Sequence, residues 1–490
     1  MAKRRSPKQL KVKSRAGGPT RLSPRFSPAL LTDLYQLTML QAYFEERMSA
    51  TAVFSLFARR LPERRNYLLA CGLDDVLTFL ETLRFDQAAL EYLESLGQFS
   101  KRFLRHLETL RFTGDVYAVL EGTPVFANEP VLEVEAPIAE AQLVETVVMN
   151  EVHLQTVLAS KASRVVHAAR GRQVVDFGLR RIHGGDAGMK GARAFYIAGV
   201  DATSNVAAGQ AYGIRVAGTM AHSYIQAHDE EFEAFRNFAR LYPDTVLLVD
   251  TYDTLEGVSK VIELARTLGP QFKVKAIRLD SGDLRQLSIQ ARRMLDDAGL
   301  QRVTIFASGG LNEDEVAKLM ASGAPIDGFG VGADMGVSRD IPSLDFAYKL
   351  VEYAGQPRLK LSAGKDTLPG RKQIFRIERD GVADHDVLGR RDEKVAGRPL
   401  LQQVMAGGKR CAPRVALADA REHAKREMER LPARLREIEP ATPRYVVETS
   451  AALVRDMEAG RRQHEVSDVG RVSGVGRVST VGRVFRPGKR

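Results

Sequence analysis

Hydrophobic positions follow two different periods in the first 170 residues. Over 30–110 leucines recur mostly at helical spacing, beginning after Thr32-Asp33, which offers an N-cap, and only a short apolar run at 51–57 interrupts the pattern. Over 112–136 valine-rich runs are broken by glycine and proline, which predicts short strands. A long helical pattern returns over 138–170. The sequence therefore predicts a helical region that contains a small β layer.

From residue 172 onward a different rhythm begins. Apolar, β-rich runs end in polar clusters, and most are followed by a helical stretch; the runs are 173–175, 196–198, 216–217, 246–249, 275–279, 303–306 and 328–332. The stretches between successive runs are long enough for the crossover connections that parallel strands need. We therefore expect an α/β fold, an irregular parallel (β/α) barrel with a smaller α+β domain built largely from the N-terminal part. In such a barrel the polar clusters meet at one mouth.

These sequence patterns divide the chain of 490 residues into five expected segments. A six-residue pattern, Val-Gly-Arg-Val-Ser and a spacer, recurs near the end and is far too short for a solenoid. The segments are a disordered basic tail (1–29), an N-terminal helical and β-layer domain (30–171), the barrel (172–400), a C-terminal helical extension (401–460) and a basic low-complexity tail (461–490).

Charge and composition argue against two classes of protein, nucleic-acid-binding domains and membrane-spanning proteins. The net charge is +11, but residues 1–27 carry +9 and residues 461–490 carry +6, so the body between them is mildly acidic. That distribution argues against a nucleic-acid-binding domain, and we do not expect the tails to bind nucleic acid. No apolar run approaches the roughly 18 residues of a membrane span. Two distant cysteines, Cys71 and Cys411, fit a reducing compartment, so we expect a cytoplasmic protein.

Two glycine-rich turns lie at predicted strand ends. Ser308-Gly309-Gly310 precedes a helix with Asn312 as its N-cap, an arrangement that aims backbone N–H groups at an anion such as phosphate. The next unit ends in Gly328-Phe329-Gly330-Val331-Gly332. Each turn could equally be a tight connection, although late strand ends are common phosphate sites in barrels.

Three further clusters carry candidate chemistry. Arg278 and Asp280 flank a turn that could bind a polyhydroxyl ligand, although Asp283 there could simply cap a helix. His222 follows a short strand and could be a nucleophile or base if Asp250 orients it; a structural histidine is the alternative. Phe177 beside two arginines suits a planar ligand with a carboxylate, or a core position.

Together the motifs resemble a known family. The chain contains in order Thr32-Asp33-Leu34-Tyr35-Gln36, the stretch 176–181, Thr203-Ser204-Asn205, the stretches 218–223 and 278–283, and Ser308-Gly309-Gly310. This set resembles nicotinate phosphoribosyltransferase, of the type II phosphoribosyltransferases, over about residues 30–400. The resemblance implies that nicotinate and phosphoribosyl pyrophosphate form nicotinate mononucleotide and pyrophosphate, with ATP hydrolysis, in NAD salvage.

The resemblance also implies roles for individual residues. His222 would be phosphorylated by ATP, with Asp250 as its orienting partner, and Asp280 would meet the ribose. Phe177 and Tyr35, the latter from the second subunit of a homodimer, would sandwich the pyridine ring. Arg180, Thr219 and Arg278 would meet the base or pyrophosphate. The 5′-phosphate would be held by Ser308, Gly309, Gly310, Gly330 and Gly332. Mg²⁺ would accompany pyrophosphate, with water and substrate as most of its ligands, so no residue is assigned to metal.

The sequence departs from the family at one loop and leaves two alternative functions. Ala333-Asp334 stands where the family commonly has threonine, which puts a carboxylate near the expected phosphate. A nicotinamide phosphoribosyltransferase is the nearest alternative, and in such relatives an aspartate in the region of Asp201 accepts the amide N–H. An inactive barrel that binds partners through its basic tails is the alternative of another class.

Overall fold

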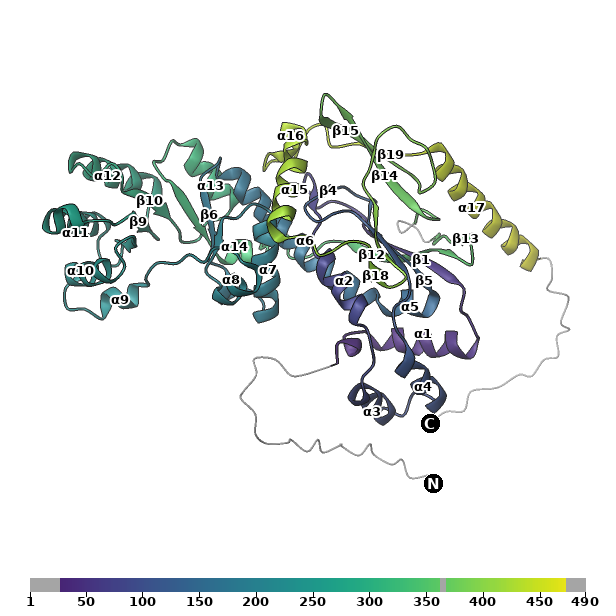
Figure 1. Cartoon of the computed structure of the whole chain (residues 1–490). Helices are drawn as coiled ribbons and strands as arrows, with labels where there is room; N and C mark the ends of the chain where they lie inside the picture. The colour runs from purple at the N-terminus through teal and green to yellow at the C-terminus, as the bar shows by residue number, and fades with distance from the viewer. Residues whose placement is uncertain (1–26, 362–366, 473–490) are drawn as a thin grey trace, which may run out of the picture.

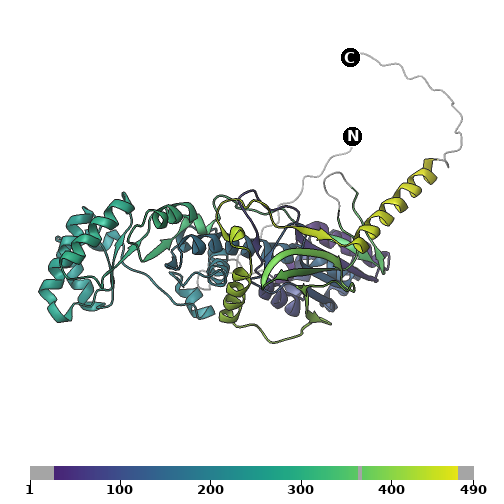
Figure 2. The same ribbon diagram turned by 90° about the horizontal axis from the view of Figure 1, so that it is seen from above.

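The computed structural model describes residues 27–361 and 367–472, and side chains as far as residue 462. The chain forms two units side by side, a parallel α/β unit and a sheet-rich unit, with helix α6 (Glu145–Ala168) running between them (Figure 1). Seen from above, the two units form an elongated molecule (Figure 2). The expected tails lie mostly outside the described residues.

Two helices of the sheet-rich unit begin at side-chain caps, one at Asp86 and one at Ser100. The predicted helix after Asp33 is confirmed, but the Asp33 carboxylate accepts a hydrogen bond from Thr146 rather than capping its own helix. The leucine pattern over 90–110 does not form one continuous helix, because Ser100 caps a separate helix there. The helices are η1 (Pro28–Leu30), α1 (Leu34–Glu45), α2 (Leu73–Thr82), α3 (Gln87–Ser95), α4 (Lys101–Thr109) and α5 (Ile138–Leu143).

The main sheet of this unit combines both ends of the chain. Its order is β13-β12-β1-β5-β3-β17-β18, with β1 (Thr51–Ala58) paired antiparallel to β5 (Pro130–Pro137) and to β12 (Phe346–Tyr353). The apolar run at 51–57 is thus a central strand, buried almost throughout. The barrel segment expected to reach residue 400 ends earlier, because β12 already belongs to this sheet. The remaining strands are β3 (Asp115–Ala118), β13 (Gln356–Pro357), β17 (Gln402–Ala406) and β18 (Lys409–Arg410).

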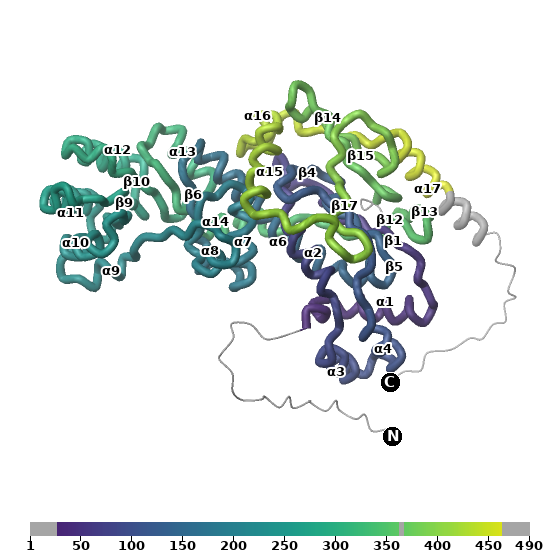
Figure 3. The backbone as a smooth tube through the Cα atoms, viewed as in Figure 1, coloured from purple at the N-terminus to yellow at the C-terminus, as the bar shows by residue number. Residues whose placement is uncertain are grey.

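The C-terminal part adds a second sheet and a long helix. The helical extension expected over 401–460 is only partly helical, since β17 and β18 join the main sheet. The second sheet contains β14 (Lys372–Arg379), β15 (Val382–Arg390), β16 (Arg398–Pro399) and β19 (Val447–Thr449), and β2 (Leu68–Leu69) pairs with β4 (Pro124–Val125). The helices are α15 (Leu417–Glu429), α16 (Ala433–Arg436) and α17 (Ala451–Val472). In Figure 3, the C-terminal segment runs from α15, beside the parallel unit, back across the sheet-rich unit to α17.

The parallel unit confirms the predicted α/β architecture, as a curled half-barrel. Its sheet has the order β7-β6-β11-β10-β9-β8, every pair being parallel, and only an isolated bridge between Thr203 and Val216 extends it. The strands are β6 (Gln173–Asp176), β7 (Ala202–Thr203), β8 (Val246–Leu248), β9 (Ala276–Leu279), β10 (Thr304–Ala307) and β11 (Gly328–Val331). The strand expected at 196–198 is wrong, because those residues end a helix and β7 forms four residues later.

Helices cover the parallel strands, which are buried at most positions. They are η2 (Leu179–Arg181), α7 (Gly185–Ile197), α8 (Val206–Tyr212), α9 (His222–Gln226), α10 (Glu231–Leu241), α11 (Thr254–Leu268), η3 (Gly269–Gln271), α12 (Leu284–Asp297), α13 (Glu313–Ala321) and α14 (Ala333–Gly336). Two hydrophobic cores result: one fills the parallel unit and continues to Leu69, Phe126 and Ala383 of the sheet-rich unit, and the other lies within the sheet-rich unit. Among the described residues no helix is long and apolar enough to cross a membrane.

Candidate active site

Arg278, in β9, joins residues from three strand ends. Its guanidinium donates to the Thr219 hydroxyl at 2.6 Å, to the Ser308 hydroxyl at 2.9 Å and to the Asp280 carboxylate at 3.0 Å. A further bond reaches the carbonyl oxygen of Met220. Because the rigid guanidinium fork satisfies these groups together, it holds three predicted site residues in one cluster.

Asp280 stays a carboxylate in this cluster. Burial raises its pKa, but the hydrogen bond from Ser308 and the nearby Arg278 charge outweigh burial and lower the pKa below its ordinary value. The backbone N–H of Asp280 donates to Asp250 at 2.9 Å, and the Ser281 hydroxyl donates to the same Asp250 oxygen at 2.6 Å. Asp250 therefore supports the turn that carries Asp280.

His222 lies beside this cluster, at the first residue of α9. Its Nδ1 atom is 3.1 Å from the hydroxyl oxygen of Thr251, and its Nε2 atom is 3.7 Å from Oδ2 of Asp280. The expected contact between His222 and Asp250 is wrong in this structure: Thr251, the next residue along the chain, meets the ring. Sequence reasoning missed Thr251, although its position directly after a strand-end aspartate was a usable signal.

Phe177 follows β6 and faces the same cluster. The Arg278 guanidinium carbon lies 5.7 Å from the centre of its ring, and the ring of Phe306 lies 6.0 Å away. Gly330 makes room for this ring, since a Cβ there would lie 2.5 Å from a Phe177 ring carbon. Gly330 therefore has a packing role beside Phe177, and its expected phosphate contact stays a prediction.

The turn after β10 has the geometry expected of an anion site. Gly309 has a φ of +89°, and a Cβ there would lie 1.8 Å from the Asp280 carbonyl oxygen, so only glycine fits. The Asn312 side chain caps α13 by accepting from the N–H groups of residues 314 and 315. Gly310 also has positive φ and is open to solvent. These features leave an exposed, glycine-lined turn directly ahead of a helix N-terminus.

The neighbouring turn, after β11, resolves the departure at Ala333-Asp334. Gly332 packs against the backbone of Phe177, where a Cβ would lie 3.3 Å from the carbonyl oxygen. The Asp334 carboxylate is 2.8 Å from the ammonium group of Lys161, a buried residue of α6. Asp334 is thus paired with a cation rather than left free beside a bound phosphate.

Two predicted residues do not join the cluster within this chain. Tyr35 is 49% exposed on α1, which belongs to the sheet-rich unit and lies apart from strands β8–β10 in both views (Figures 1 and 2). Burial and the carboxylate of Glu145 raise the pKa of Tyr35 to about 12. Arg180, in η2, is exposed. Neither side chain is positioned by the groups that Arg278 holds.

Asp201 lies at the amino-terminal ends of the parallel strands, opposite the ends that carry the cluster. Its carboxylate accepts hydrogen bonds from the backbone N–H of Val174 and from Arg421, both at 2.9 Å. Since Val174 and Asp201 stand at the amino-terminal ends of β6 and β7, Asp201 is far from the carboxyl ends that carry the cluster. It is therefore a structural residue.

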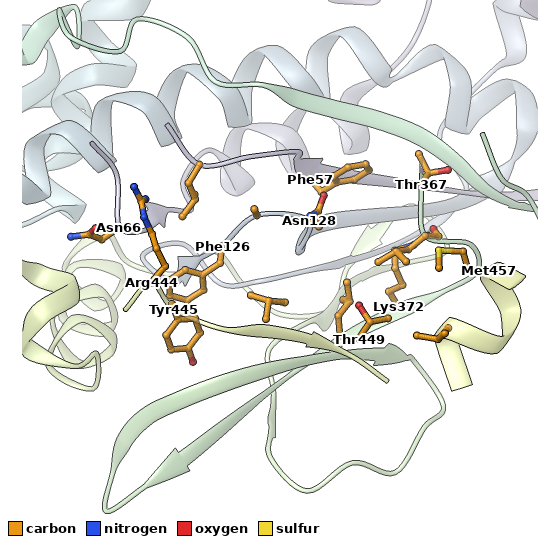
Figure 4. A pocket seen from close by; sticks show the side chains of 16 residues that line it. Phe57, Asn66, Phe126, Asn128, Thr367, Lys372, Arg444, Tyr445, Thr449 and Met457 are labelled. Carbon is orange, nitrogen blue, oxygen red and sulfur yellow. The ribbon is translucent and has the colours of Figure 1, made fainter. Parts of the chain in front are cut away.

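A separate cavity of about 580 Å³ lies in the sheet-rich unit (Figure 4). Phe57, Phe126 and Tyr445 line it, together with the aliphatic and polar groups of the second sheet. None of the predicted site residues lines this cavity. The candidate active site is the cluster at the mouth of the half-barrel.

The parallel half-barrel and the N-terminal part of the chain both match domain models of phosphoribosyltransferases. The N-terminal domain of nicotinate phosphoribosyltransferase (NAPRTase) matches residues 30–153, and the C-terminal domain of quinolinate phosphoribosyl transferase matches residues 158–349. The chain belongs to the nicotinate phosphoribosyltransferase family.

Individual relatives agree with that assignment. A nicotinate phosphoribosyltransferase of Mycobacterium tuberculosis (pncB2) is 56% identical over 430 residues, which cover 88% of this chain and 93% of the relative. The Bacillus subtilis nicotinate phosphoribosyltransferase is 41% identical, over 77% of this chain and 79% of its own length. The crystal structure of human nicotinic acid phosphoribosyltransferase has a TM-score of 0.79 at 29% identity, covering 87% of this chain and 99% of its own.

Proposed function

We propose that this chain is a nicotinate phosphoribosyltransferase, which forms nicotinate mononucleotide and pyrophosphate from nicotinate and phosphoribosyl pyrophosphate in NAD salvage. The observation that carries the proposal is the Arg278 cluster, in which Thr219, Asp280 and Ser308 meet one guanidinium beside His222. The names of the relatives, one of them 56% identical, support the same substrates.

The geometry suits displacement at the anomeric carbon of a ribose. The bond from that carbon to the pyrophosphate oxygen breaks, and the pyridine nitrogen forms the new bond, through a transition state with positive charge on the sugar. Asp280, kept ionised by Ser308 and Arg278, binds ribose hydroxyls and stabilises that charge. Phe177 offers its ring to the pyridine, and Arg278 its charge to a carboxylate or pyrophosphate.

In this proposal, His222 is the residue that reacts with ATP. The imidazole is only partly buried, with Nδ1 against Thr251 and Nε2 facing Asp280. A ring nitrogen accepts the terminal phosphoryl group of ATP, which releases ADP, and water later removes the group as phosphate. Coupling of this cycle to nucleotide formation makes the overall reaction favourable. The position of the ring beside the Asp280 cluster supports such coupling.

Mg²⁺ is expected to accompany the pyrophosphate group. Oxygen donors suit this ion, and one oxygen of the Asp250 carboxylate is buried and without a hydrogen-bond partner. The Asp250 carboxylate fits an ion whose other ligands are water and substrate. When bound, Mg²⁺ neutralises charge on the leaving pyrophosphate.

A homodimer with shared active sites would explain the position of Tyr35. Tyr35 and Leu34 are exposed on α1, and Leu31, which precedes this helix, is exposed as well. Helix α1 lies apart from β6, the strand that Phe177 follows (Figure 1). In the dimer, Tyr35 of the partner subunit covers the pyridine ring opposite Phe177. We also propose a cytoplasmic location, which the two free cysteines support.

The testing experiment is an assay of nucleotide formation from phosphoribosyl pyrophosphate with nicotinate and, separately, with nicotinamide, each with and without Mg-ATP. We expect nicotinate turnover that ATP stimulates, and loss of this stimulation in His222→Ala. His228→Ala is the matched control, because that imidazole pairs with the Tyr224 carbonyl oxygen. Turnover of nicotinamide alone, or of neither base by folded protein, would contradict the proposal.

A further inference from the structure

One buried lysine stands behind both glycine-rich turns. Lys161 is 2% exposed on α6, the helix against which α13 and α14 pack (Figure 1). Its ammonium nitrogen lies 2.6 Å from Glu313, 2.8 Å from Asp334 and 2.9 Å from Asp340. A single side chain therefore contacts three carboxylates from separate positions in the second half of the half-barrel.

Two of these carboxylates directly follow the turns that line the site. Glu313 is the first residue of α13 and comes three residues after Gly310, and Asp334 comes two residues after Gly332. A displacement of either carboxylate would move the turn ahead of it. Arg164, also on α6, adds a second contact to Glu313 at 3.0 Å.

Lys161 is unsuited to bind a phosphate itself. An ammonium group has three N–H donors, and three carboxylate oxygens already lie within 3 Å of it. Lys161, Arg164 and Arg65 balance the three carboxylates, because Arg65 pairs with Asp340 at 2.8 Å. Burial lowers the pKa of Lys161, but Glu313 and its fellow carboxylates outweigh burial and raise it, so the ammonium stays charged.

We propose that Lys161 is a positioning residue that ties the turn after β10, through Glu313, to the turn after β11, through Asp334, and so sets the spacing of the two turns around the ribose phosphate. This inference rests on the proposed function, since it names phosphoribosyl pyrophosphate as the ligand. It also gives Asp334 a role at the loop where the family commonly has threonine.

The charge of Asp334 makes the test decisive. Removal of a carboxylate near an anionic ligand should tighten binding through simple electrostatics. If Asp334 instead holds the turn in place, Asp334→Asn should weaken binding. The matched control is Glu315→Gln, which removes from the first turn of α13 an exposed carboxylate that pairs with Lys318.

The experiment measures the dissociation constant of phosphoribosyl pyrophosphate with Mg²⁺ by calorimetry, and the two KM values by kinetics. For Asp334→Asn we expect binding weaker by about tenfold, with the nicotinate KM unchanged, and recovery in Asp334→Glu; Glu315→Gln should bind like the wild type or tighter. Lys161→Arg, which keeps the charge but alters its reach, should also raise the phosphoribosyl pyrophosphate KM.

The outcomes separate this inference from the proposed function. Unchanged or tighter binding by folded Asp334→Asn would overturn the inference, even if the wild type turns over nicotinate. Binding by the wild type without turnover would overturn the proposed activity, and the comparison of variants would still judge the role of Lys161. Should Asp334→Asn fail to fold, Lys161→Arg decides by the same binding measurement.

Discussion

The guanidinium of Arg278 donates a hydrogen bond of 2.6 Å to the hydroxyl of Thr219, although 59 residues separate them in the chain. Thr219 lies in the segment that precedes α9, and Arg278 lies in β9. The bond ties the stretch that carries His222 to the strand that leads into Asp280. The reacting groups of the site therefore depend on one arginine for their relative positions.

Replacement of Arg278 by lysine should lower kcat/KM for nicotinate by about 100-fold. Lysine keeps the positive charge but cannot satisfy Thr219, Asp280 and Ser308 together, and the loss of charge-assisted hydrogen bonds of this kind costs about 2–3 kcal/mol. Steady-state kinetics would measure the change. Arg293→Lys, on the exposed face of α12, is the control and should behave like the wild type. Equal activity of both variants would exclude the proposed role of Arg278.

Thr251 should affect the ATP-dependent part of the reaction most. Thr251→Val removes the hydroxyl 3.1 Å from His222 Nδ1 at nearly constant volume, so the ring loses the partner that sets its orientation. We expect ATP stimulation to fall by about tenfold, and Thr251→Ser to restore it. Rates with and without ATP give the measurement. A valine variant with full stimulation would show that the contact has no part in catalysis.

Two adjacent glycines provide a stability test of the turn after β10. Gly309→Ala should destabilise the fold by several kcal/mol, because its Cβ would meet the Asp280 carbonyl oxygen at 1.8 Å. Gly310→Ala meets nothing within 4 Å, so only the positive φ should cost it about 1 kcal/mol. Urea unfolding of both variants compares them directly. Similar values for the two would mean that the turn relaxes freely.

The variant Gly330→Ala tests the expected base site and the expected phosphate site separately. Gly330→Ala places a methyl group 2.5 Å from the Phe177 ring, so the ring must move. The KM for nicotinate should rise by about tenfold, whereas the KM for phosphoribosyl pyrophosphate should change little. If the second KM rises instead, Gly330 contacts the phosphate as the sequence first indicated.

The Asp280 carboxylate should make the stability of the protein depend on pH at the acid end. Its pKa in the folded state lies below the ordinary value of about 3.9. The stabilisation by its ion pair is thus fully present above that value and is lost as pH falls through the lower, folded-state pKa. Urea unfolding of wild type and Asp280→Asn between pH 7 and 3 should show a difference that shrinks towards pH 3. A difference that grows on acidification would contradict the lowered pKa.

The sequence predicted those parts of the fold that depend on local patterning. β6, β8, β9, β10 and β11 lie at or within a residue of the predicted runs, because buried parallel strands are continuous apolar segments. The prediction failed at 196–198, where an apolar stretch ends α7. An apolar run of that length fits a buried helix end as well as a strand, and packing decides between them.

In the candidate site, too, some residues could be predicted from local patterns, and others were revealed only by packing. The residue types at the strand ends, and their order, were enough to identify Arg278, Asp280, His222 and the turn at Ser308 as one candidate site. Lys161 was missed because nothing in its helical pattern marks it, and Thr251 was missed although it directly follows the strand-end aspartate Asp250. Their roles depend on contacts across many residues, such as the 2.8 Å ion pair between Lys161 and Asp334.

By itself, the sequence determined the α/β class, the family and the residues of the candidate site, because local periodicity and side-chain chemistry can be recognised along the chain. Only the tertiary structure decided which groups meet: Thr251 rather than Asp250 at His222, Phe177 at Gly330, and Lys161 between the two turns. It also joined β12 to β1 across nearly 300 residues. Such contacts follow from the packing of whole elements, and no local pattern specifies them.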